Sequence, residues 1–209
     1  MEGRLHPLCF LTPEASSTAG LMDTVRKVLD GGVSWIQYRQ KNKDRRTMFF
    51  EAEKMRKLTK DCGACLVVND FADIALAVDA DGVHLGQDDL PLREARKIMG
   101  TGIVGISTHR LSEAIEAEAG GADYVGFGPL FPTTTKDAGE PKGIHALESV
   151  CTQLRIPVIA IGGIRISHVE ALFRARCAGI AVSSGLLEGD IRETARTFMS
   201  RIARAACAS

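Results

Sequence analysis

The sequence predicts a single (β/α)8 barrel, an α/β fold in one domain that spans residues 1–209. Short apolar runs alternate with helical patterns along the whole chain, and eight such pairs follow one another. The apolar runs also lack polar alternation, which is typical of strands buried on both faces of a parallel sheet. An open, doubly wound sheet is the alternative. The absence of a Gly-x-Gly-x-x-Gly motif after the first strand weakens its dinucleotide-binding form.

The first half of the chain supplies four predicted strands and four predicted helices. The strands cover His6–Thr12, Val33–Arg39, Ala64–Val68 and Gly82–Leu85. The helices cover Leu21–Leu29, Asp44–Lys60, Ala72–Val78 and a segment that opens at Pro91. Local signals support these bounds, because Gly31 and Gly32 suit a helix end and Asp44 suits an N-cap. Proline at position 91 is favoured in a first helical turn.

The second half repeats the pattern. The strands cover Ile103–Ile106, Tyr124–Phe127, Pro157–Ile161 and Gly179–Val182. The helices cover Ser112–Ala119, Ala146–Leu154, Ser167–Arg176 and Ile191–Ala205. The long loop after Phe127 is unusual for a compact domain, and such loops are often functional. It carries donors suited to phosphate oxygens, although an ordinary surface loop is the alternative; the donors are Thr133, Thr134, Thr135 and Lys136.

Composition excludes several classes of partner. Lys and Arg total 26 and Asp and Glu total 26, so no overall field favours nucleic acid or an anionic membrane. The chain begins without a signal-peptide pattern and contains no apolar stretch of membrane-spanning length, so we expect a cytoplasmic protein. The pair Cys62 and Cys65 has CxxC spacing, but no second pair completes a zinc site, and we expect ordinary thiols. The oligomeric state is left open, a homo-oligomer included.

Polar residues follow most of the predicted strands at their carboxyl ends, where barrel enzymes place their active sites. In chain order they are Gln37, Arg39 and Lys41, then Asn69 and Asp70, Asp88 and Asp89, Ser107, Lys136, Gly163, and last Ser183 and Ser184. One polar strand end would mean little. Several on the same rim indicate a binding site.

Two carboxylates stand on adjacent strand ends, Asp70 with either Asp88 or Asp89. Such hard oxygen ligands suit Mg²⁺, which takes a couple of carboxylates together with waters and substrate phosphates. Helix capping is the alternative, because Asp70 and Asp89 both precede predicted helices. The pattern therefore predicts a Mg²⁺ site at this edge of the barrel.

The remaining rim residues suit phosphate. Arg39, Lys41 and Lys136 supply positive charge for a polyphosphate held at the metal. The small residues after the last two strands offer backbone N–H groups, where barrels often bind a phosphate monoester. Two phosphate sites suggest an enzyme that joins two phosphorylated small molecules. An aldolase or isomerase is the alternative, but the two rim lysines lack the apolar setting that a Schiff-base lysine needs.

Taken together, the rim motifs resemble those of the thiamine-phosphate synthase family. The matching segments are Gln37–Lys41 (QYRQK), Val68–Asp70 (VND), Asp81–Asp89 (DGVHLGQDD), Gly105–His109 (GISTH), Gly126–Lys136 (GFGPLFPTTTK) and Ile161–Ile164 (IGGI). Any one of these segments alone would be weak, whereas their order and spacing together are specific.

The resemblance implies an enzyme that couples a hydroxymethylpyrimidine diphosphate to a thiazole phosphate and releases pyrophosphate through a pyrimidine carbocation. Mg²⁺ would be held by Asp70 and Asp89. The residues expected at the pyrimidine diphosphate are Gln37, Arg39, Lys41, Asn69, Ser107 and Lys136, of which Arg39, Ser107 and Lys136 form the expected catalytic set. The residues expected at the thiazole phosphate are Thr133, Thr135, Gly163, Ser183 and Ser184.

Three features depart from the family pattern. Gln40 stands where glutamate is common, Ser183 replaces an apolar residue, and the loop after Lys136 is shorter than in many members. The related thiazole tautomerases share the barrel and the thiazole phosphate site, but they typically lack the two carboxylates and carry histidine where this chain has Pro129. A phosphate-binding sensor without turnover is a further alternative, which pyrophosphate release would distinguish.

Overall fold

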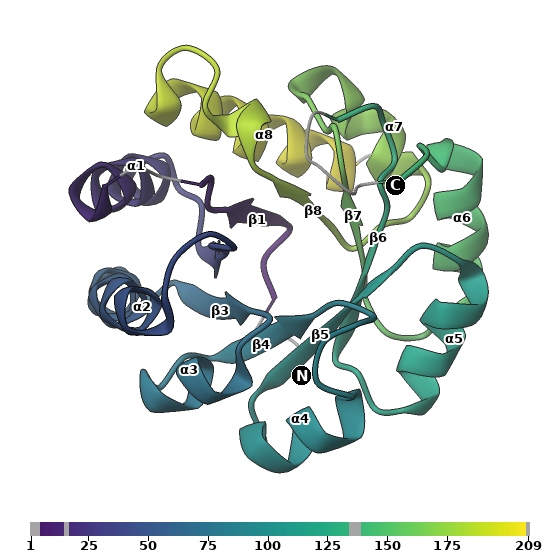
Figure 1. The fold of residues 1–209 in the computed structure, drawn as a ribbon. Helices are drawn as coiled ribbons and strands as arrows, with labels where there is room; N and C mark the ends of the chain where they lie inside the picture. Colours follow the sequence, from purple (N-terminus) through teal and green to yellow (C-terminus); the bar gives the residue numbers. More distant parts are fainter. Residues whose placement is uncertain (1–4, 15–16, 134–138, 208–209) are drawn as a thin grey trace.

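The computed structural model describes residues 5–14, 17–133 and 139–207, and it confirms the predicted barrel. Eight parallel strands follow one another around a closed ring, and the first strand pairs with the last. The helices lie outside this ring (Figure 1). Closure excludes the open, doubly wound sheet.

The structure gives the elements the following bounds. The strands are β1 (Leu8–Leu11), β2 (Trp35–Tyr38), β3 (Cys65–Asn69), β4 (Gly82–Leu85), β5 (Ile103–Thr108), β6 (Tyr124–Phe127), β7 (Val158–Ile161) and β8 (Gly179–Val182). The helices are α1 (Thr18–Asp30), α2 (Arg45–Asp61), α3 (Ala72–Ala77), α4 (Leu92–Met99), α5 (Leu111–Ala119), α6 (Gly143–Gln153), α7 (Val169–Arg174) and α8 (Ile191–Cys207). Two 3₁₀ turns are η1 (Ile166–His168) and η2 (Ser184–Leu186).

Helix ends account for most differences from the predicted bounds. Asp44 caps α2 as expected, accepting a hydrogen bond from the Thr47 N–H at 2.9 Å. Helix α1 begins before the predicted Leu21, because the Ser17 side chain accepts a hydrogen bond from the Gly20 N–H at 3.2 Å and caps the helix there. Helix α6 also begins earlier than predicted, and the seventh helical segment starts as the 3₁₀ turn η1.

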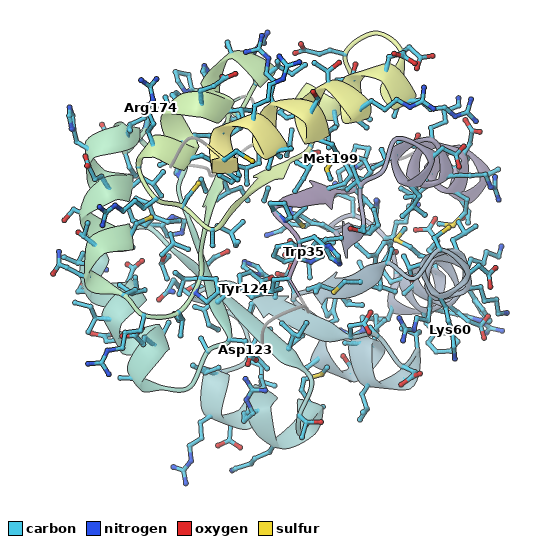
Figure 2. All side chains as sticks on the ribbon, turned by 180° about the vertical axis from the view of Figure 1, so that it is seen from behind. Trp35, Lys60, Asp123, Tyr124, Arg174 and Met199 are labelled. Atoms are coloured by element: carbon cyan, nitrogen blue, oxygen red, sulfur yellow. The ribbon has the colours of Figure 1, made fainter. Side chains whose placement is uncertain are left out.

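The barrel separates two apolar cores. One lies between the strands and the helices, and the other fills the barrel interior. The interior core includes Trp35 and Tyr124, whose rings meet edge to face with centroids 5.2 Å apart. Figure 2 shows both side chains near the centre of the ring of strands. Each strand is therefore buried on both faces, which explains why its sequence lacks polar alternation.

The CxxC pair is divided between the surface and the interior. Cys62 is exposed at the end of α2, whereas Cys65 is buried in β3 and belongs to the interior core. This separation agrees with the expectation of ordinary thiols. Among the described residues, no helix is both long enough and apolar enough to cross a membrane.

Candidate active site

The loop after β2 presents the cations of the site, and it is fastened to the loop after β1. The Thr12 hydroxyl accepts a hydrogen bond from the Arg39 N–H at 2.8 Å and lies 3.1 Å from the Arg39 carbonyl oxygen. The Glu14 carboxylate accepts from the Lys41 N–H at 2.8 Å. These contacts fix the backbone that carries Arg39 and Lys41 onto the rim. Sequence reasoning missed Thr12 and Glu14, because their partners lie far along the chain.

Gln40 differs from its neighbours because it is buried. Its amide nitrogen donates to the Pro13 carbonyl at 2.7 Å, so the side chain ties the same two loops together. The sequence suggested that a neutral residue at this position leaves the rim short of one charge. The structure places Gln40 beneath the rim, so its change from the family pattern affects loop packing rather than the exposed surface.

The carboxylate pair predicted at β3 and β4 forms from Asp70 and Asp89. The two side chains are in contact with each other, and the Asp89 carboxylate also accepts from the Gly86 N–H at 2.6 Å. Asp88 is exposed, so Asp89 rather than Asp88 is the partner of Asp70. Burial and the contact with Asp89 raise the pKa of Asp70 from 3.8 to about 6, whereas Lys41 and Arg39 act in the opposite direction.

The capping alternative is wrong for both carboxylates. Helix α3 begins after Phe71 and α4 begins after Pro91, and neither helix start has a side-chain cap. Asp70 instead has a φ of +66°, a left-handed conformation that Asp adopts more readily than most residues and that is enriched at functional sites. The Lys41 ammonium lies 4.0 Å from its carboxylate.

Two carboxylates in direct contact fit a small divalent cation. Their mutual repulsion is relieved when a cation lies between or beside them. Among the described residues, no group of three or more His, Cys, Asp and Glu side chains is gathered for a metal. Such a pair could hold Mg²⁺, which completes its shell with water and phosphate oxygens.

Ser107 lies on β5 and joins a polar chain inside the barrel. Its hydroxyl is 2.8 Å from Nε2 of His84, and Nδ1 of the same ring is 2.9 Å from the Tyr124 hydroxyl. Burial lowers the pKa of His84 to about 4, so the imidazole is neutral near pH 7. The Ser107 carbonyl accepts a hydrogen bond from the Gln87 amide at 2.6 Å. Gln37 and Asn69, at the ends of β2 and β3, are also buried.

Sequence reasoning assigned no role to His84 or Tyr124. Glycines inside two strands could have indicated these two rings, since a glycine in a strand often marks the close approach of another group. Tyr124 pairs with Gly105 across β5 and β6, and a Cβ at Gly105 would lie 2.1 Å from the Tyr124 ring.

The opposite edge of the rim is formed by the ends of β6, β7 and β8. Gly163 has a φ of +64°, and a Cβ there would lie 2.4 Å from the Pro132 carbonyl oxygen. The Phe131 N–H donates to the Gly162 carbonyl at 3.1 Å, and the Phe131 ring stacks on His168 with centroids 3.8 Å apart. The loop after β6 is therefore held against the end of β7.

This packing brings the first part of the predicted phosphate loop to the β7 edge. Thr133 follows directly after Pro132 and is partly buried. Ser183 and Ser184 lie at the start of η2, where the N–H groups of a first turn have no acceptor within it. The predicted residues Thr135 and Lys136 lie outside the described residues.

Comparison with known proteins decides the family. Residues 8–186 match the profile of the family described as thiamine monophosphate synthase. The chain belongs to this family. Thiamine monophosphate synthase relatives with similar sequences include the thiamine-phosphate synthase of Chloroflexus aurantiacus, which is 46% identical over 167 residues covering 79% of this chain and 77% of the relative. The thiamine-phosphate synthase of Chlorobium luteolum is 45% identical over 92% of this chain and 91% of its own length.

A solved structure extends the family likeness to three dimensions. The thiamine phosphate pyrophosphorylase of Pyrococcus furiosus superposes with a TM-score of 0.87 at 36% sequence identity. The match covers 95% of this chain and 96% of that one. The barrel fold is therefore shared with this thiamine phosphate pyrophosphorylase.

Proposed function

We propose that the chain is a thiamine-phosphate synthase, a transferase that joins a pyrimidine diphosphate to a thiazole phosphate and releases pyrophosphate. The observation that carries this proposal is the contact between Asp70 and Asp89 on a rim that also presents Arg39 and Lys41. A metal-binding acidic pair beside cations suits a diphosphate, and family membership supports the activity. A cytoplasmic location, predicted from the sequence, is part of the same proposal.

The rim around β2 to β5 would bind the diphosphate. Asp70 and Asp89 would hold Mg²⁺, which when bound neutralises diphosphate charge and makes pyrophosphate a better leaving group. Arg39 and Lys41 face the same space and would pair with the diphosphate oxygens. Their backbone is held by Thr12 and Glu14, so both cations are positioned before substrate arrives.

The edge formed by β7 and β8 would bind the thiazole phosphate. The close approach of Gly163 to Pro132 leaves no room for a side chain, so glycine allows the β6 loop to lie against the end of β7. The Ser183 and Ser184 turn adds hydroxyls and N–H groups that suit a phosphate monoester. Thr133 approaches this edge from the β6 loop.

In the proposed reaction, the C–O bond between the pyrimidine methylene and the diphosphate breaks and its electron pair leaves with pyrophosphate. The thiazole nitrogen then forms a C–N bond to the resulting carbocation. This path requires no nucleophilic side chain. The buried, neutral His84 agrees with a path without a nucleophile, since its two ring nitrogens already contact Ser107 and Tyr124. The main contribution of the protein is stabilisation of the charge that develops on the departing pyrophosphate.

The test is pyrophosphate release from the purified protein with the pyrimidine diphosphate, the thiazole phosphate and Mg²⁺, each omitted in turn. Release that requires all three, with thiamine phosphate as product, is the expected result. Release without the thiazole phosphate would indicate a hydrolase. Binding of the thiazole phosphate without any release would contradict the synthase and favour the sensor or the tautomerase.

A further inference from the structure

Four polar side chains cross the barrel interior from β2 to β5 and end at the rim. In order of contact they are Gln37, Tyr124, His84 and Ser107. We propose that the hydrogen bonds of these side chains all point the same way, each group donating to the next from Gln37 to Ser107. The Ser107 hydroxyl is then left as a hydrogen-bond donor to the leaving diphosphate. Tyr124 and His84 are then positioning residues that act through Ser107. The role toward diphosphate rests on the proposed function, whereas the direction of the chain does not.

The direction follows from the number of protons available. A neutral imidazole has one N–H donor and one acceptor nitrogen. The Gln37 side chain hydrogen-bonds the Tyr124 oxygen, and in the proposed direction its amide N–H is the donor. The buried Tyr124 O–H then needs an acceptor, and Nδ1 of His84 lies 2.9 Å away.

This assignment determines the other half of the ring. With Nδ1 as the acceptor, the proton of His84 is on Nε2, and it points at the Ser107 oxygen 2.8 Å away. The Ser107 oxygen thus receives a hydrogen bond from inside the barrel. Its own O–H is free to donate toward the rim, where Ser107 is partly exposed. The opposite tautomer would instead draw the Ser107 proton inward.

Packing holds the two rings of the chain against the strands. The Tyr124 ring lies against the backbone of Gly105, and the His84 ring lies against Gly126, where a Cβ would be 3.2 Å from the imidazole. Trp35 covers the Tyr124 ring edge to face, and the Tyr124 and His84 rings stack with centroids 5.4 Å apart. These contacts hold both rings in place, so each nitrogen of the His84 ring keeps its hydrogen-bond partner.

A fixed neutral donor suits this position. Negative charge grows on the diphosphate as the C–O bond breaks, and donors aimed at developing charge lower the barrier without reorganisation. The nearby carboxylates Asp70 and Asp89 already carry negative charge. A serine donor held by a neutral histidine assists the leaving group without adding another anion.

The first test measures the tautomer directly and needs no turnover. Two-bond ¹H–¹⁵N NMR spectra of the wild-type protein at pH 7.5 distinguish Nε2–H from Nδ1–H imidazole. The His84 signals are assigned by their loss in His84→Gln. A neutral ring with its proton on Nε2 is expected. A proton on Nδ1, or a charged ring at this pH, would overturn the proposed direction.

The second test is a double-mutant cycle in steady-state kinetics. Tyr124→Phe keeps the ring but removes the donor to Nδ1, so kcat should fall about fivefold to tenfold, with little change in KM for the thiazole phosphate. In a Ser107→Ala background the same substitution should have no further effect. An equal loss in both backgrounds would show that Tyr124 does not act through Ser107.

Two further variants separate positioning from general damage. His84→Gln should retain more activity than His84→Leu, because the glutamine amide supplies an N–H near the place of Nε2. Equal activity of the two variants would contradict the donor role. Tyr38→Phe is the matched control, since it removes a buried phenol that hydrogen-bonds Glu51 at 2.9 Å on the helix side of β2. A loss in Tyr38→Phe as large as in Tyr124→Phe would assign the effect to structure alone.

Discussion

Asp70→Asn should raise the free energy of unfolding of the metal-free protein near pH 7.5 and at the same time abolish most turnover. Asparagine is nearly isosteric with aspartate and tolerates the φ of +66°, so the backbone strain at this position is unchanged. The Asp70 N–H also keeps its hydrogen bond to the His84 carbonyl at 2.8 Å. The substitution therefore removes the charge and little else.

The size of the expected gain in the free energy of unfolding follows from the pKa of Asp70, which burial and contact with Asp89 raise from 3.8 to about 6. One pKa unit corresponds to about 1.4 kcal/mol, so ionised Asp70 destabilises the folded state by up to about 3 kcal/mol above pH 6. The side chain is 16% exposed, and solvent screening reduces this to about 1–3 kcal/mol. A chain of this length gains about 2–4 °C in Tm per kcal/mol.

The pH dependence provides the control. Because the pKa of Asp70 is raised in the folded state, protonated Asp70 contributes stability that is fully present below pH 3.8. This contribution is lost as pH rises through about 6. The advantage of Asp70→Asn should therefore be small near pH 4, grow between pH 4 and 6, and be complete at pH 7.5. Thermal unfolding in buffers with a chelator measures it, and Mg²⁺ should raise the Tm of the wild type more than that of the variant. An asparagine variant less stable than the wild type at pH 7.5, or with full turnover, would refute this account of the carboxylate pair.

Four other substitutions test the rest of the site and the cysteine pair. Gly163→Ala should raise the KM for the thiazole phosphate at least tenfold in initial-rate measurements. The added Cβ would meet the Pro132 carbonyl, and the φ of Gly163 is left-handed. An unchanged KM would place the phosphate elsewhere. Cys62→Ser should leave both rate and Tm unchanged, because Cys62 is exposed. Cys65→Ser should lower the free energy of unfolding in denaturant by about 1–2 kcal/mol without loss of rate, because Cys65 is buried. Lost activity in both variants would revive a redox role. Lys136→Ala should lower kcat by about 100-fold in pyrophosphate release, and an effect on the thiazole phosphate KM alone would move the residue to the other site.

Much of this protein could be predicted from local patterns. Eight apolar runs that each precede a helical pattern predict the barrel, because strands buried on both faces need no polar alternation. Barrel enzymes place their sites at the carboxyl ends of the strands, so the rim residues followed once the strands were assigned. The two phosphate sites could be proposed because acidic, basic and small residues gather at different strand ends.

The tertiary structure alone decided which of these side chains meet. Asp70 contacts Asp89 rather than Asp88, and Gln40 turns beneath the rim, because loop closure and burial determine these directions. The interior chain through Tyr124 and His84 could not be predicted from the sequence either, since its members lie on strands far apart in sequence. A residue pattern shows what each strand buries and where it ends. The register of parallel strands around a closed ring decides which buried groups are within hydrogen-bonding distance of one another.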